Sequence, residues 1–177
     1  MDFKNTLYSR LERYCRVDTQ SDPDSKTFPS TKKQLVLLKM LAAELKKIGA
    51  KKVKMDRWGY VTAELPATVK GKKPAIGFLA HADTSPDASG AGVKPRVHKA
   101  WKGGDIVLSR KHGVVLNRRN CPELAGREGE DIVTASGDTL LGADNKAGLA
   151  IIMTAAEYLL KHPEIPRGTL RIGFTPD

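Results

Sequence analysis

Apolar residues recur every three or four positions in two stretches near the N-terminus, as they do on one face of a helix. The first stretch, over residues 2–14, predicts an amphipathic helix that ends near Val17. The second predicts a helix with Ser30 or Thr31 as its N-cap and Gly49 as its stop signal. The apolar positions are Phe3, Leu7, Leu11 and Tyr14 in the first helix and Leu35, Leu38, Leu41, Leu45 and Ile48 in the second.

Four further stretches have the patterns of β-strands. Residues 51–55 and 60–65 alternate between apolar and polar, and Gly59 between them permits the positive φ of a hairpin connection. Residues 75–80 form a near-continuous apolar run, which is typical of a strand covered on both faces, and residues 169–174 predict another buried strand. Helices and strands in this arrangement predict an α/β fold with a layered sheet flanked by helices.

Residues 84–137 have a different character, with several prolines, many glycines and short strand-like pieces at 105–108 and 113–116. The stretch is too long for an ordinary connection, so we expect an elaborated excursion at the sheet edge, and such insertions are often functional. After it, Asp144 is expected to cap a long helix that runs to Leu160.

The composition fits one domain, because 177 residues with 40% hydrophobic content can bury a real core. No stretch approaches the roughly 20 apolar residues that cross a bilayer, and the polar start lacks a signal-peptide pattern, so we expect no membrane partner and a cytoplasmic location. Cys15 and Cys121 are too few for a disulfide framework and are expected to be reduced thiols. A nucleophilic cysteine paired with a histidine stays open, although Cys15 lies in a helical pattern that favours a buried thiol.

The formal net charge of +10 suggests a basic nucleic-acid-binding domain as one alternative. The lysines gather at a helix-to-strand junction, residues 46–54, and at a turn, residues 70–73, where solvated side chains are expected. Aromatic residues make up only 6% of the chain, too few for a base-stacking platform. Residues 90–94 lack the spacing of a phosphate-binding loop. We therefore expect no nucleic-acid partner.

Candidate chemistry begins at the end of the apolar run 75–80, where His81 and Asp83 follow. Residues two apart in a strand point to the same face, so Asp83 can orient a metal-binding His81 while Ala82 packs on the other side. Ligands of open α/β sheets lie at the carboxyl ends of strands, which is where this pair falls. The alternative is a hydrogen-bonded pair without metal, because the motif alone is weak.

Asp144 strengthens this candidate site, since it begins a helix that would pack beside the strand ending at His81. Both side chains could then face one crevice, where a carboxylate can bridge two metal ions about 3.5–4 Å apart. The alternative role of Asp144 is the helix N-cap alone. For Asn145 and Lys146 we expect solvent exposure, and the glycines on either side, Gly142 and Gly148, would allow close backbone approach.

Three segments carry a resemblance to the peptidase T family, the tripeptide aminopeptidases among the dinuclear zinc exopeptidases. These segments are residues 77–85, 139–148 and 173–177. The motifs around His81 and Asp144 are shared with the wider superfamily, and the residues around them favour peptidase T. Asn145 departs from the second aspartate often found at its position, which is not the bridging one. The resemblance extends over essentially the whole chain.

The resemblance implies the catalytic domain of a metallo-aminopeptidase that releases the N-terminal residue of tripeptides by zinc-activated water. It also implies roles for three residues of this chain. His81 would bind one of two zinc ions, Asp83 would orient His81 and act with it in catalysis, and Asp144 would bridge both ions.

In the family, the stretch that matches residues 175–177 continues into two glutamates, the general base and a zinc ligand. Those glutamates, the later aspartate and histidine ligands and the dimerisation and lid domain have no counterpart in these 177 residues. We therefore expect residues 1–177 to form the N-terminal part of a catalytic domain, inactive alone and binding zinc weakly or not at all. Asp177 is expected to be disordered rather than catalytic.

The complete enzyme implied by the resemblance would act on tripeptides, with a homodimer as one option. A different class of function stays open for the chain itself. It could be a non-enzymatic, truncated module that associates with itself through an exposed sheet edge.

Overall fold

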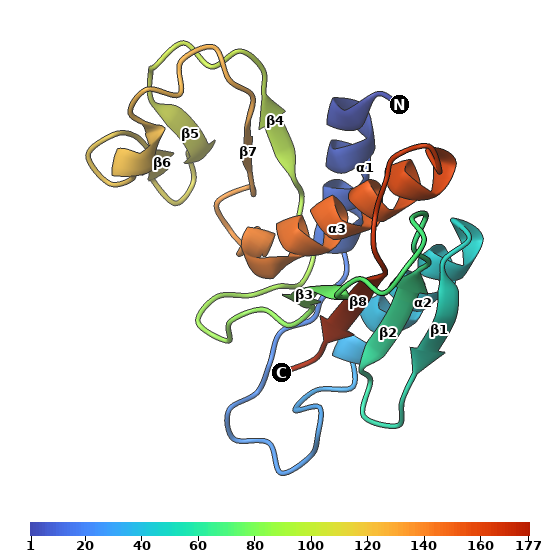
Figure 1. The fold of residues 1–177 in the computed structure, drawn as a ribbon. Coiled ribbons are helices and arrows are strands. Elements are labelled where there is room, and N and C mark those ends of the chain that lie inside the picture. Colours follow the sequence, from blue (N-terminus) through green and yellow to red (C-terminus); the bar gives the residue numbers. More distant parts are fainter.

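A computed structural model describes all residues, Met1–Asp177. The helices are α1 (Phe3–Cys15), α2 (Gln34–Lys47) and α3 (Ala143–Lys161), with a 3₁₀ helix, η1 (Pro122–Leu124). The strands are β1 (Lys51–Met55), β2 (Val61–Leu65), β3 (Ile76–His81), β4 (Arg96–His98), β5 (Ile106–Ser109), β6 (Val114–Leu116), β7 (Ile132–Thr134) and β8 (Leu170–Thr175). Figure 1 shows helices packed on a central sheet, with a separate group of short strands to one side. The predicted α/β fold is confirmed.

The central sheet has the strand order β1-β2-β8-β3. β8, the last strand in sequence, lies in the interior, antiparallel to β2 and parallel to β3. In the parallel pair His81 is opposite Thr175, so the carboxyl ends of β3 and β8 meet at the same edge of the sheet. The predicted hairpin from β1 to β2 is also present, and Gly59 has a φ of 99°.

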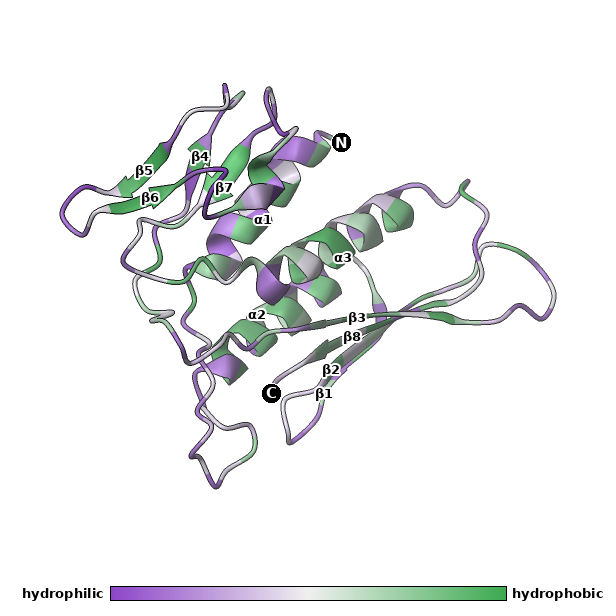
Figure 2. Ribbon diagram, turned by 90° about the vertical axis from the view of Figure 1, so that its left-hand side faces the viewer, coloured by the Kyte–Doolittle hydropathy of each residue, from purple (hydrophilic) through white to green (hydrophobic).

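All three helices lie on one side of the sheet (Figure 2). α2 packs on β1, β2 and β8, α3 packs on β3, and α1 packs on α3. The core forms between these layers because the apolar stripes of the helices meet one face of the strands. Its fully buried members include Leu37, Leu38, Leu41 and Leu45 of α2, Val61 of β2, Phe174 of β8, and Leu149 and Met153 of α3.

The expectation that residues 75–80 are covered on both faces is wrong for this structure. β3 is an edge strand, and Ile76, Phe78 and Leu79 are 55%, 46% and 71% exposed. Leu79 points to the sheet face that carries no helix, whereas Ala80 points to α3 and is buried. An apolar run indicates that both faces of a strand favour burial, but it does not show which element packs on each face.

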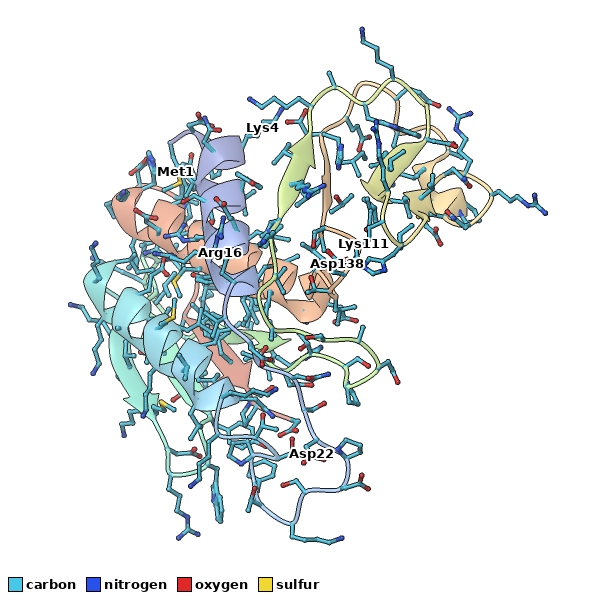
Figure 3. The ribbon with its side chains drawn as sticks, turned by 180° about the vertical axis from the view of Figure 1, so that it is seen from behind. Met1, Lys4, Arg16, Asp22, Lys111 and Asp138 are labelled. Carbon is cyan, nitrogen blue, oxygen red and sulfur yellow. The ribbon has the colours of Figure 1, made fainter.

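The excursion over residues 84–137 is present, but its strands form an arm that lies beside α1, on the helix side of the sheet, rather than at the sheet edge (Figures 1 and 2). β4 pairs antiparallel with β7, and β5 pairs with β6 in a hairpin that covers both predicted strand-like pieces. The arm has a small core of its own, built from Trp101, Ile106 and Leu124. Lys4, labelled in Figure 3, lies on the side of α1 that faces the arm, and its Nζ is 2.7 Å from Asp131 Oδ2.

Two predicted helix boundaries are confirmed and one is wrong. α1 begins after Asp2, whose carboxylate accepts a hydrogen bond from the Asn5 backbone N–H, and Gly49 follows α2 with a φ of 95°. α2 begins later than predicted and has no side-chain cap. Thr31 instead donates its hydroxyl to the Gln20 carbonyl at 2.7 Å, because the preceding loop takes up the capping group.

The lysines of the junction over residues 46–54 are exposed, as expected for solvated side chains. No helix has both the length and the apolar character needed to cross a membrane.

Candidate metal centre

His81 is the last residue of β3 and lies at the carboxyl edge of the sheet. The strand direction continues for one more residue, since the Ala82 N–H donates to the Thr175 carbonyl at 2.8 Å, and Ala82 is fully buried. Asp83 therefore returns to the face of His81, where its Oδ1 is 3.0 Å from the imidazole Nδ1. The predicted pairing of these two side chains is present in the structure.

Asp144 approaches His81 from the start of α3. Gly142 takes a left-handed conformation with a φ of 78°, and Asp144 and Asn145 interrupt the first turn with non-helical dihedral angles. The peptide bond between Asp144 and Asn145 is cis. In this position the Asp144 carboxylate is 92% exposed, and its Oδ1 lies 3.0 Å from His81 Nε2.

The expectation that Asp144 caps the helix through its side chain is wrong, because no side-chain cap hydrogen bond is present at the start of α3. The non-helical dihedral angles of Asp144 turn its carboxylate toward the end of β3 instead. Asp144, a residue type that favours the N-cap position, thus lies next to His81 instead.

The imidazole of His81 is held between two carboxylates, with one at each ring nitrogen. A neutral imidazole has one N–H, so when Nδ1 donates to Asp83, Nε2 presents a lone pair toward the Asp144 oxygen. A lone pair that faces a carboxylate oxygen at 3.0 Å is an arrangement that a metal ion between the two atoms would satisfy. Two donors of a tetrahedral zinc lie about 3.3 Å apart, which is close to the observed separation. His81 and Asp144 thus fit two positions of a zinc site.

The donor set is limited to these two groups. No cluster of three or more His, Cys, Asp or Glu side chains is placed to hold one metal ion, because Asp83 faces the other ring nitrogen. The remaining histidines have partners elsewhere: His98 pairs with Thr134, His112 with Asp138 and His162 with Glu164.

The predicted close approach at two glycines is confirmed. A Cβ on Gly148 would lie 3.3 Å from the Ala80 Cβ and far too close to the Asn145 amide, and a Cβ on Gly142 would lie 3.1 Å from Thr84 Cγ2. Both contacts join the start of α3 to the end of β3. The glycines therefore let the segment that carries Asp144 come near His81.

Lys146 was expected in solvent, but it is 1% exposed and donates its Nζ to the Val17 carbonyl at 2.8 Å. Burial lowers its pKa. The helical pattern did not reveal that Lys146 is buried, because the break at Asp144 and Asn145 rotates the first turn inward.

Burial also raises the pKa of the nearby Cys15 thiol to about 11. A protonated, buried Cys15 without a histidine partner does not support the cysteine nucleophile.

Asp177 was expected to be disordered, and the structure places it differently. Its carboxylate accepts hydrogen bonds from the backbone N–H and the hydroxyl of Ser30, and its own N–H donates to Gln34 Oε1 at 3.1 Å. Burial alone would raise its pKa, but these hydrogen bonds outweigh that effect and lower the pKa. Sequence reasoning missed these contacts because Ser30 and Gln34 lie 147 and 143 positions away from Asp177 in sequence.

No protein-family model matches the chain, whereas curated relatives do. Peptidase T of Geobacillus thermodenitrificans is 51% identical over 174 residues, or 98% of this chain. Peptidase T of Brevibacillus brevis is 52% identical over 174 residues, and that of Clostridium botulinum is 52% identical over 171 residues. The chain spans 42% of the length of each of these relatives.

Two solved structures resemble the chain in fold. A tripeptidase from Staphylococcus aureus superposes with a TM-score of 0.61 at 19% identity, covering 98% of this chain and 36% of its own. Aminoacylhistidine dipeptidase from Vibrio alginolyticus gives a TM-score of 0.58 at 21% identity, covering 97% of this chain and 27% of its own. Identities this low show the fold alone.

Proposed function

The chain resembles the N-terminal part of peptidase T, and from that premise we propose that it forms part of a metallo-aminopeptidase that releases the N-terminal residue of tripeptides. Because the chain spans 42% of these relatives, we assign residues 1–177 to the N-terminal part of the catalytic domain. The remaining catalytic residues and a dimerisation and lid domain would come from sequence beyond this part. The two unpaired thiols fit a reducing compartment such as the cytoplasm.

The site supports specific roles for three side chains. His81 and Asp144 would hold a zinc ion, and Asp144 would also be shared with a second ion. Asp83 would keep the His81 proton on Nδ1, so that Nε2 stays available as a donor. When bound, zinc supplies an activated water and polarises the scissile carbonyl. The observation that carries this proposal is that His81 has a carboxylate at each of its two ring nitrogens, Asp83 at Nδ1 and Asp144 at Nε2.

A zinc titration of the 177-residue protein, followed by ¹⁵N resonances of its histidines, tests the site. We expect His81 to respond first among the four histidines and the affinity to be weak, since two donors are half of the usual four. Asp144→Ala should remove the response. Asp138→Ala is the matched control, because Asp138 also pairs with a histidine, His112, but lies in the arm. A first response at another histidine would contradict the assignment, and tight binding lost in Asp144→Ala would contradict the expected weakness.

The same protein should not hydrolyse tripeptides when zinc is added. Hydrolysis needs a general base near the water, and the one carboxylate beside His81 other than Asp144 is committed to the imidazole Nδ1. Release of the N-terminal residue can be followed by chromatography. Turnover that His81→Ala abolishes would show that these residues are sufficient and would refute this part of the proposal.

A second candidate function, self-association, is favoured by the free edge of β3. An unpaired strand edge that exposes Phe78 and Leu79 is a template for pairing with a second copy. Size-exclusion chromatography with light scattering should then show a dimer that Phe78→Lys converts to a monomer. Val107→Lys is the control, since Val107 is exposed to the same degree but lies on β5. A wild-type monomer at high concentration would remove this candidate.

A further inference from the structure

The segment that follows α1, residues 17–21, contacts both parts of the candidate metal centre. The Thr84 N–H donates to the Thr19 carbonyl at 3.1 Å, and the Ser21 N–H donates to the Thr84 carbonyl at 3.0 Å. Gln20 and Thr84 thus form a short parallel bridge next to Asp83. Through these backbone bonds, residues 17–21 hold the segment that follows His81 at the end of β3, which includes Asp83.

Lys146 ties the same segment to the other donor. Its side chain crosses from the first turn of α3 to the Val17 carbonyl, and it lies two residues after Asp144. A Cβ on Gly142 would lie 3.5 Å from both Cδ and Nζ of Lys146, so the side chain runs directly past the left-handed glycine that starts the turn. Residues 17–21 are therefore bonded to the His81 side and to the Asp144 side of the pair.

Burying the Lys146 ammonium costs free energy. Lys146 is 1% exposed, and Nζ has one hydrogen-bond acceptor, a neutral carbonyl, with the charge of Asp18 nearby. A buried ammonium with so little compensation contributes little to stability. A role in holding Asp144 in place explains why a lysine occupies this position.

We propose that Lys146 is a positioning residue that sets the separation of His81 Nε2 and Asp144 by anchoring the start of α3 to Val17. The effect of Lys146 on metal binding rests on the proposed function, whereas its effect on the separation of His81 and Asp144 does not. Removal of the anchor should free the turn that carries Asp144. Asp83 should be unaffected, because the backbone bonds of Thr84 hold it independently of Lys146.

The test is Lys146→Met in the zinc-free 177-residue protein, with ¹⁵N-labelled histidine. We expect the His81 Nε2 resonance to move toward that of a free imidazole, because its carboxylate partner is released, while the Nδ1 resonance stays. Arg10→Met is the matched control, since it also removes a buried cation that contacts α3, but at Thr154 and Glu157. It should leave both His81 nitrogens unchanged even where the protein is less stable.

Zinc titration is the second readout, and it separates this inference from the proposed function. Lys146→Met should weaken zinc binding on the order of 10–100-fold, as loss of residues that orient metal ligands does. If wild-type protein gives no zinc response but Nε2 moves in Lys146→Met, positioning stands, whereas the weak zinc binding expected of this chain under the proposed function fails. If Lys146→Met does not fold, Lys146→Gln is used in its place. Glutamine keeps an N–H donor, so a smaller shift of the His81 Nε2 resonance is expected. A folded variant with unchanged Nε2, or with both nitrogens moved equally, overturns the inference.

Discussion

Arg10 and Lys146 are two buried cations, both of which join the N-terminal region to α3, and their surroundings differ sharply. Arg10 is 6% exposed and donates to Glu44 at 2.8 Å, to Thr154 at 2.9 Å and to Glu157 at 2.5 Å. Lys146 is still more buried and donates to one carbonyl. The first cation is neutralised by two carboxylates, whereas the second is not in contact with any.

The pKa shifts of the two cations have opposite directions for this reason. Burial lowers the pKa of Lys146. Burial also opposes the charge of Arg10, but hydrogen bonds with Glu44 and Glu157 outweigh it and raise the pKa. A buried charge can thus serve stability when it is paired, as Arg10 is with Glu44 and Glu157. The unpaired Lys146, beside Asp144, is better explained by the geometry of the site.

The largest effect should come from Arg10→Met, which leaves Glu44 and Glu157 without their buried partner. Breaking a buried ion pair from one side costs about 3–5 kcal/mol, because a charge remains uncompensated. Urea denaturation measures the loss. Arg13→Met is the control, since Arg13 also contacts Glu44, at 2.6 Å, but its side chain is 51% exposed, and its loss should be below about 1 kcal/mol. Equal losses in the two variants would show that the burial of Arg10 does not set its contribution to stability.

Acid should remove part of the same stabilisation. Burial would raise the pKa of Glu44, but hydrogen bonds from Arg10, Tyr14 and Arg13 lower it below the ordinary 4.5. A carboxyl group with a depressed folded pKa contributes stability above its unfolded pKa, and this is lost as pH falls through the folded value. The free energy of unfolding should therefore decline below about pH 4.5 in wild type and more weakly in Glu44→Gln. Identical slopes would show that Glu44 does not carry the acid sensitivity.

Gly142→Ala tests the path of Lys146 at an intermediate magnitude. A φ of 78° strains alanine by about 1–2 kcal/mol, and the new Cβ would press on Thr84 and on the lysine side chain. Gly49→Ala is the matched control, since Gly49 has a φ of 95° with nothing within 4 Å of the added Cβ. Both should lose stability, but Gly142→Ala alone should shift the His81 Nε2 resonance. A silent Nε2 would mean that the turn tolerates the displacement.

Much of the fold could be read from periodicity, because the helices and strands here follow their apolar patterns closely. The stripe of α2 is confirmed at Leu38, Leu41 and Leu45, and the hairpin and the arm fall where turn residues predicted them. Periodicity did not predict the burial of β3, because burial depends on which other elements pack against the strand. The run ending at Ala80 looked covered on both faces, yet β3 is an edge strand with Leu79 exposed.

The site was partly predictable for a similar reason. The two-residue spacing of His81 and Asp83 fixes their common face, so their contact followed from strand geometry alone. The contact with Asp144 depended on how α3 begins, and residue preference suggested a cap where the structure has none. The burial of Lys146 had no local signal, because its acceptor, Val17, is 129 residues away in sequence.

The smallest change in stability should come from Lys146→Met. Methionine has nearly the length of lysine and removes the cost of burying an ammonium, while the Val17 carbonyl loses its donor. These effects oppose each other, so we expect a loss of about 1 kcal/mol or less in urea denaturation. A loss as large as that of Arg10→Met would place Lys146 in the same structural class as Arg10. A small loss together with a displaced Asp144 would separate the cation that stabilises the fold from the one that arranges the site.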